Sequence, residues 1–126
     1  MQRIRFGIVG LALVAVLAAC GTASGAPTSD VDPADADLTI TSSAMAFDTD
    51  TLTVPAGEAF TLAYANTEAM PHNVAIYTDE SASDALFAGE EIETSTIVYE
   101  IPALEPGEYF FRCDLHPDMA GTVIVE

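Results

Sequence analysis

Beyond residue 37 the chain consists of short runs rich in β-branched and aromatic residues, separated by turn residues. No stretch repeats its apolar residues with the 3.6-residue period of an α-helix. In residues 60–64 the large apolar side chains alternate with smaller ones, as in a strand with one buried face. The runs that we expect to form strands are 38–42, 44–47, 51–54, 59–65, 73–77, 95–101, 108–113 and 121–125.

Proline and glycine separate several of these runs. Pro55 and Gly57 stand between two runs, and Pro106 and Gly107 stand between two others. Proline presets φ and glycine permits positive φ, so both pairs are typical of turns at strand ends. About eight short strands in roughly 90 residues predict an all-β fold, a Greek-key β-sandwich of two antiparallel sheets. We place this domain at residues 37–126 and expect a loop or a short helical turn at residues 78–93.

The first nineteen residues are typical of an export signal. Arg3 and Arg5 precede an apolar run that is short for a membrane-spanning helix, which needs about 20 apolar residues. The run ends in Leu-Ala-Ala-Cys at residues 17–20, which resembles the bacterial lipobox, where the cysteine is acylated. We therefore predict a lipoprotein signal peptide at 1–19, lipidation at Cys20 and an extracytoplasmic domain anchored to the cell membrane. The alternative is that residues 1–19 form an uncleaved anchor helix. In that case too the domain would lie outside the cytoplasm.

Residues 20–36 are rich in Gly, Ala, Ser, Thr, Pro and Asp, which predicts a flexible tether between the lipid and the domain. If the leader is removed, Arg112 alone opposes all 20 carboxylates. A surface this acidic would repel nucleic acid and anionic membrane lipids. We therefore expect the protein to be attached to the membrane only through the lipid on its N-terminus. The charge favours a cationic protein partner or a high-salt medium, although solubility alone could also explain it.

The chain has two cysteines, and if Cys20 carries lipid, Cys113 cannot form an internal disulfide. An unpaired thiol in an oxidising compartment is explained either by burial as a small apolar side chain or by metal ligation. His116 and Met119 follow Cys113 at intervals of three residues, and His72, the other of only two histidines, lies in a separate loop. Singly, each of these side chains has an ordinary explanation in packing. Jointly, they favour a metal site.

Copper is a metal that binds all four of these side chains. A thiolate and two imidazoles suit Cu(II), while a thiolate and a weak thioether suit Cu(I), so one ion could cycle with little rearrangement. Structural zinc usually takes four firm ligands, and a thioether is a poor one. A binuclear copper site needs a second thiolate, and no arrangement typical of an enzyme stands out. The open alternative to electron transfer is a protein that binds copper for delivery or storage.

The motif Cys113-x-x-His116-x-x-Met119-x-Gly121, preceded by Tyr109-x-Phe111, resembles that of the cupredoxin family. Pro71-His72-Asn73-Val74 supplies the second part of the resemblance, which extends over residues 38–126. Its short ligand loop is similar to that of amicyanin, and its acidic lipoprotein character is similar to that of halocyanins. Further matching residues in the N-terminal strands are Phe47, Leu52, Val54, Gly57 and Asn66.

The resemblance implies a monomeric type 1 blue-copper protein that binds one copper ion and carries electrons between redox proteins such as a cytochrome or an oxidase. His72, Cys113 and His116 would be equatorial ligands and Met119 the axial ligand. It also implies that the edge of His116 exchanges electrons through an exposed apolar patch. The candidates for this patch are Met45, Met70, Pro71, Leu115 and Pro117.

Three residues next to the expected ligands, Asn73, Asp114 and Leu115, are expected to support the metal site. By family analogy, the Asn73 side chain joins the two ligand loops near Asp114, where aspartate departs from the family pattern. Amicyanin and plastocyanin have proline at the position of Leu115, which keeps its backbone N–H. If that N–H and the N–H of Asn73 both reach the Cys113 sulfur, two donors would stabilise the thiolate.

Overall fold

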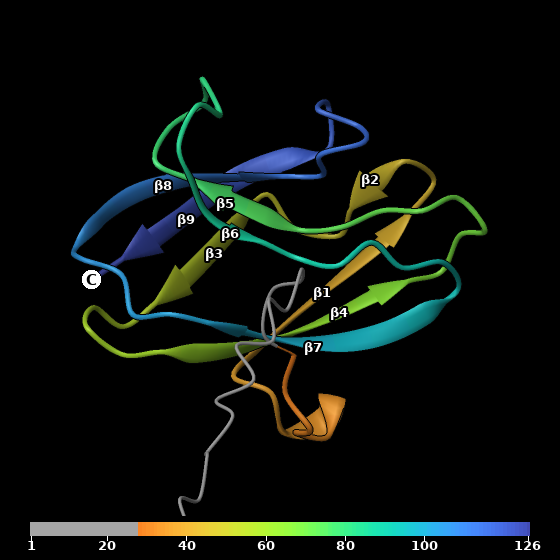
Figure 1. Cartoon of the computed structure of the whole chain (residues 1–126), viewed down its shortest axis with the longest axis horizontal. Helices are drawn as coiled ribbons and strands as arrows, with labels where there is room; N and C mark the ends of the chain where they lie inside the picture. Colours follow the sequence, from red (N-terminus) through yellow and green to blue (C-terminus); the bar gives the residue numbers. More distant parts are fainter. Residues whose placement is uncertain (1–27) are drawn as a thin grey trace, which may run out of the picture.

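The computed structural model describes residues 28–126 of the 126-residue chain. The predicted signal peptide and Cys20 lie outside the described residues. A short 3-10 helix, η1 (Pro33–Asp35), precedes nine strands in this range (Figure 1). They are β1 (Leu38–Ser43), β2 (Ala46–Phe47), β3 (Thr51–Val54), β4 (Phe60–Asn66), β5 (Ala75–Tyr77), β6 (Ala85–Ala88), β7 (Ser95–Ile101), β8 (Gly107–Arg112) and β9 (Ala120–Val125).

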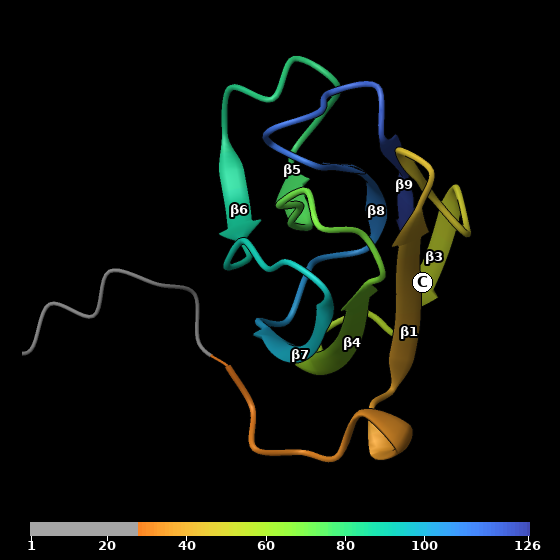
Figure 2. The ribbon, with the colours of Figure 1, turned by 90° about the vertical axis from the view of Figure 1, so that its right-hand side faces the viewer.

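The strands form two sheets that face each other (Figure 2), which confirms the predicted all-β sandwich. One sheet has the order β2-β1-β4-β7 and the other has the order β3-β9-β8-β5-β6. Their facing side chains make one apolar core. As the alternation predicted, Phe60, Leu62 and Tyr64 of β4 belong to this core. Tyr64 keeps a polar partner there, because its hydroxyl lies 2.8 Å from the Ser42 hydroxyl.

Two sequence-based expectations about the sheets were wrong. The sheets are not wholly antiparallel, because β1 pairs with β4 and β3 pairs with β9 in parallel. The chain crosses to the other sheet at β3 before it returns as β4, which allows the parallel pairing. In addition, the irregular segment 78–93 contains strand β6, which pairs with β5 through a register shift. Its sequence, Ala-Leu-Phe-Ala, has little β propensity, so its partner strand defines it.

The described part of the expected tether packs on the domain. Thr28 forms an isolated bridge with Tyr99 of β7, and the Ser29 N–H donates to the Val98 carbonyl at 2.9 Å. The sandwich therefore has contacts with the chain ahead of residue 37, where we expected the domain to begin. None of the helices in residues 28–126 is long and apolar enough to cross a membrane.

Gly121 allows β9 to pass close to the core beside the β8–β9 loop. A Cβ atom at this position would lie 2.5 Å from Cε1 of Phe111 and would overlap the Asp50 carbonyl oxygen. Phe111 is the residue that pairs with Gly121, and it is fully buried. Neither the backbone of Asp50 nor a buried ring can move away at little cost.

We therefore expect Gly121→Ala to destabilise the copper-free protein by about 1–3 kcal/mol, the usual cost of overpacking a core. Urea unfolding followed by circular dichroism measures this free energy. An unfolding midpoint equal to that of the wild type would show that the strand accommodates the methyl group, and that packing does not require glycine here.

Candidate metal centre

Two loops meet at one end of the sandwich. The β4–β5 connection carries His72, and the β8–β9 loop carries Cys113, His116 and Met119. β5 and β8 are antiparallel neighbours in which Ala75 pairs with Arg112. If this register continues beyond the strand ends, residue 73 lies opposite residue 114. The pairing of β5 with β8 therefore brings the two loops together without any contribution from a bound metal.

Side-chain hydrogen bonds extend this pairing into the loops. The Asp114 N–H donates to Oδ1 of Asn73 at 2.8 Å, and Nδ2 of Asn73 donates to Oδ2 of Asp114 at 3.1 Å. Nδ2 of Asn73 also donates to the Gly89 carbonyl at 3.0 Å. Asn73 is buried, so these bonds satisfy polar atoms that water cannot reach. They fix the His72 segment against the Cys113 segment.

His72 is fully buried, and its backbone is held by Ile92 in an isolated β-bridge. The His72 N–H donates to the Ile92 carbonyl at 3.2 Å, and the Ile92 N–H donates to the His72 carbonyl at 3.0 Å. Nδ2 of Asn66 donates to the carbonyls of Met70 and Ile92, at 2.8 and 2.7 Å. The loop has therefore little freedom on either side of the imidazole.

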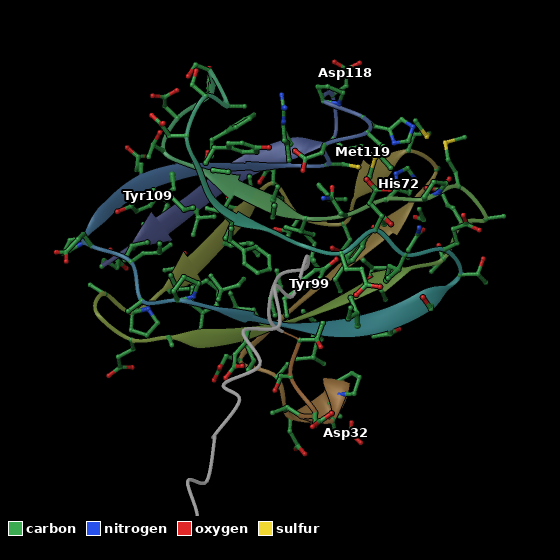
Figure 3. All side chains as sticks on the ribbon, viewed as in Figure 1. Asp32, His72, Tyr99, Tyr109, Asp118 and Met119 are labelled. Carbon is green, nitrogen blue, oxygen red and sulfur yellow. The ribbon has the colours of Figure 1, made fainter. Side chains whose placement is uncertain are left out.

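The β8–β9 loop closes on itself through two backbone hydrogen bonds. The Cys113 N–H donates to the Met119 carbonyl, and the Met119 N–H donates to the His116 carbonyl, both at 2.9 Å. Cys113 is a free cysteine with no exposed surface, and Met119 is also buried. Figure 3 places Met119 and His72 at the same end of the sandwich. The short loop thus returns Met119 to the neighbourhood of the cysteine.

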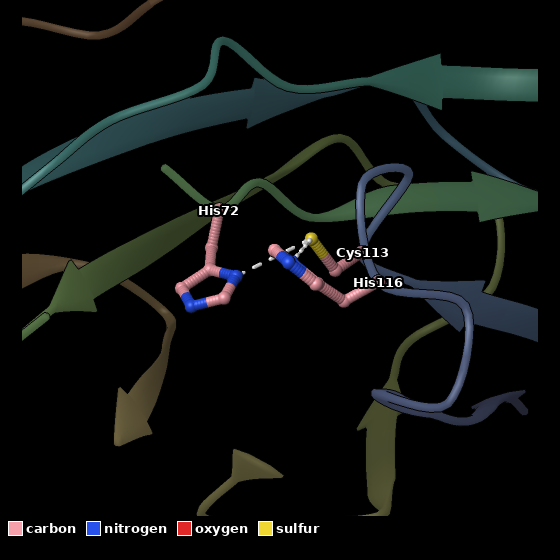
Figure 4. Close-up of side chains that lie close together, drawn as sticks. All are labelled: His72, Cys113 and His116. Carbon is pink, nitrogen blue, oxygen red and sulfur yellow. Dashed lines mark hydrogen bonds between the residues drawn. The ribbon is translucent and has the colours of Figure 1, made fainter. Parts of the chain in front are cut away.

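The structure brings His72, Cys113 and His116 together, with all three donor atoms within 4.8 Å of one another (Figure 4). Cys113 Sγ lies 3.7 Å from Nδ1 of His72 and 3.8 Å from Nδ1 of His116. A metal ion with bonds of about 2.3 Å to a thiolate and about 2.0 Å to each imidazole, in one trigonal plane, would separate sulfur from nitrogen by about 3.7 Å. These residues therefore fit a trigonal metal ion in chemistry and in spacing.

Asp114 has two further neighbours that sequence reasoning missed. The Tyr77 hydroxyl donates to Oδ1 of Asp114 at 2.5 Å, and this hydrogen bond, with burial, raises the pKa of Tyr77. Arg112 Nε lies 3.7 Å from the same oxygen, and its guanidinium lies 5.1 Å from the Tyr77 ring centroid. Tyr77 therefore remains a protonated donor, and Asp114 is held from three sides. No local motif signals these contacts, because they depend on how β5 pairs with β8.

Burial raises the pKa of Tyr64 more than that of Tyr77. Desolvation raises the pKa of Tyr64 to about 12, despite the opposing hydrogen bond from Ser42. The Tyr64 ring stacks on Tyr99 at a centroid distance of 6.1 Å and meets Phe47 edge-on at 6.2 Å. Tyr64 therefore stays uncharged within a packed aromatic cluster of the core.

The residues expected to form an apolar patch differ in exposure. Met45, Met70 and Leu115 are 44%, 46% and 42% exposed. Pro117 is also exposed, whereas Pro71 and His116 are half-buried. Within residues 28–126, the hydrogen-bond partners of Cys113 Sγ are the two imidazoles. Neither the Leu115 N–H nor the Asn73 N–H is among them, so the suggested pair of backbone donors to sulfur is not observed.

Comparisons with known proteins agree with this architecture. The family model described as a cupredoxin-like domain matches residues 10–125. Amicyanin of Paracoccus versutus is 42% identical over 94 residues, which cover 75% of this chain and 67% of the relative. Amicyanin-alpha of Methylorubrum extorquens is 30% identical over 115 residues, which cover 91% of this chain and 93% of the relative.

A solved structure shows the same fold. It is a variant of amicyanin described as its reduced Cu(I) form at pH 4. It aligns with a TM-score of 0.57 and 29% identity, over 76% of this chain and 90% of that one. Since the family model and the relatives cover most of the chain, this protein belongs to the cupredoxin-like family.

Proposed function

We propose that this protein carries single electrons on one copper ion, which His72, Cys113, His116 and Met119 would hold. The observation that carries the proposal is the convergence of one thiol and two imidazole Nδ1 atoms, with sulfur–nitrogen distances of 3.7 and 3.8 Å. The solved relative described in its Cu(I) form supports copper as the metal. When bound, copper would supply the change between the cupric and cuprous states.

The protein's own contribution is to keep the donor atoms in place during that change. His72 is held through Ile92, and Asn73 and Asp114 hold the two loops together. A donor set that suits both oxidation states and cannot move far lowers the rearrangement that accompanies each electron transfer. The buried Cys113 and Met119 keep water away from the sulfur side of the site. His116, which is half-buried, is the ligand nearest to the solvent side.

The copper-loaded protein should be intensely coloured, because thiolate-to-copper charge transfer absorbs visible light, and ascorbate should bleach it reversibly. The visible and electron-paramagnetic spectra of the purified protein measure this. Cys113→Ser should abolish the colour, whereas Ser43→Ala, an exposed change outside the site, should leave it intact. A colourless copper complex in the wild type would contradict electron transfer and favour copper delivery or storage.

We also propose that redox partners dock on an apolar patch around His116, formed by Met45, Met70, Pro71, Leu115 and Pro117. Three of these side chains are among the exposed large apolar residues of the described chain. A small patch suits electron transfer, because such complexes bury little area and dissociate quickly. The acidic surface favours a cationic partner, such as a basic cytochrome.

Leu115→Gln should slow electron transfer to a cationic c-type cytochrome by roughly tenfold, since the loss of about 1.5 kcal/mol of apolar burial weakens docking by that factor. Stopped-flow mixing at several salt concentrations measures the rate. Leu86→Gln is the matched control, because Leu86 is 38% exposed on β6 and the substitution is the same. Equal rates for both variants would show that the patch is not the docking surface.

We further propose that the protein is exported, cleaved after residue 19 and anchored by lipid on Cys20. The leader and the lipobox-like residues 17–20 support this location. The Thr28 and Ser29 contacts with β7 mean that few residues separate Cys20 from the folded domain.

Cys20→Ser should move the protein from the membrane fraction to the soluble fraction, because the acylated thiol would be lost. Cell fractionation and mass spectrometry of the N-terminus measure the change. Since Cys113 is retained, the released variant should still bind copper. The same fractionation for both proteins, or an unmodified Cys20 in the wild type, would contradict lipid anchoring.

A further inference from the structure

Glu68 contacts the imidazole of His72 on the side away from the cysteine. Oε2 of Glu68 lies 3.1 Å from Nε2 of His72, while Nδ1 of the same ring faces Cys113 Sγ. The His72 side chain is fully buried, and the Glu68 side chain is 23% exposed. The two ring nitrogens therefore have different partners, a carboxylate on one side and the metal-binding group on the other.

The backbone of Glu68 is fixed on both sides of the residue. Its N–H donates to Oδ1 of Asn66 at 2.9 Å. Its carbonyl accepts hydrogen bonds from the Thr94 N–H at 2.9 Å and from the Thr94 hydroxyl at 3.1 Å. Asn66 is the residue whose amide also holds Met70 and Ile92 beside His72. The carboxylate therefore projects from a segment that is already part of the ligand scaffold.

The same carboxylate oxygen accepts a second hydrogen bond, from the Met45 N–H at 3.2 Å. Met45 and Ala44 form the two-residue turn between β1 and β2, and both have positive φ, 62° and 52°. Such turns prefer Asn and Gly, because other side chains are strained in the left-handed region. Glu68 thus accepts a hydrogen bond from the backbone N–H of Met45 and stabilises the strained β1–β2 hairpin.

A neutral imidazole carries its proton on one nitrogen only, and the hydrogen bond of that nitrogen determines which one is free to bind a metal. A carboxylate accepts a proton-bearing donor and has none to offer. With Nε2–H directed at Glu68, the lone pair of Nδ1 points toward Cys113. Carboxylate partners of this kind orient metal-binding histidines and raise their basicity.

We propose that Glu68 is a positioning residue for His72, which fixes the Nε2–H tautomer and the ring orientation before metal binds, and couples the β1–β2 turn to the ligand. The proposal that this tautomer serves copper rests on the proposed function. The tautomer itself does not, because it is a property of the protein without metal. It can therefore be tested separately.

The first test is ¹⁵N NMR of the copper-free protein at alkaline pH, where imidazole is neutral. The wild type should show His72 as one tautomer, protonated on Nε2. Glu68→Ala should show a mixture of tautomers, whereas Glu68→Gln should keep the wild-type tautomer, because both neighbouring groups are donors and favour the amide oxygen in this position. An unmixed Nε2–H tautomer in a folded Glu68→Ala protein would overturn the proposal.

The second test is copper affinity, measured by competition with a chelator. Glu68→Ala should weaken binding by roughly 10- to 100-fold, as the loss of such partners usually does, and Glu68→Gln should recover most of it. Glu93→Ala is the matched control, because it removes the same charge from an exposed position near Thr94. Equal weakening in the Glu93 variant would show a general charge effect and overturn positioning by Glu68. A colourless wild-type complex would instead count against the proposed function and leave the tautomer result standing.

Discussion

The reciprocal hydrogen bonds between Asn73 and Asp114 are the interaction on which the metal centre depends. They continue the β5–β8 pairing beyond the last residues of the strands, where the backbone ladder has ended. Without them, the segment that carries His72 and the loop that carries Cys113 would lose the hydrogen bonds that join residue 73 to residue 114. With them, the donor atoms of two distant parts of the sequence are held within bonding reach of one ion.

Around this link, the polar groups form successive layers that each limit a different motion. Ile92 and Asn66 hold the backbone beside His72, Glu68 holds the far side of its ring, and Tyr77 and Arg112 surround Asp114. The apolar core beneath them is continuous with the aromatic side chains of both sheets. A redox centre benefits from this arrangement, because an environment that does not move between oxidation states keeps electron transfer fast.

Local features of the fold could be predicted from the sequence, whereas the pairing of the strands could not. Alternation in β4 predicted which side chains enter the core, and the close spacing of Cys113, His116 and Met119 predicted a ligand loop. The parallel pairing of β1 with β4 could not be predicted, because the period of a strand does not identify its neighbour. Strand β6 was missed since it is short and alanine-rich. Glu68 is one of 20 acidic residues, and only the fold of the β4–β5 connection distinguishes it from the others.

The central claim is that the folded chain arranges its donor atoms before copper arrives. Crystal structures of the copper-free and copper-loaded protein, with the ion located by anomalous scattering, test it directly. The account predicts that Cys113 Sγ remains within about the present 3.7 and 3.8 Å of the two Nδ1 atoms, with copper between them. Donor atoms that move apart in the copper-free crystal, or copper bound outside this group, would contradict it.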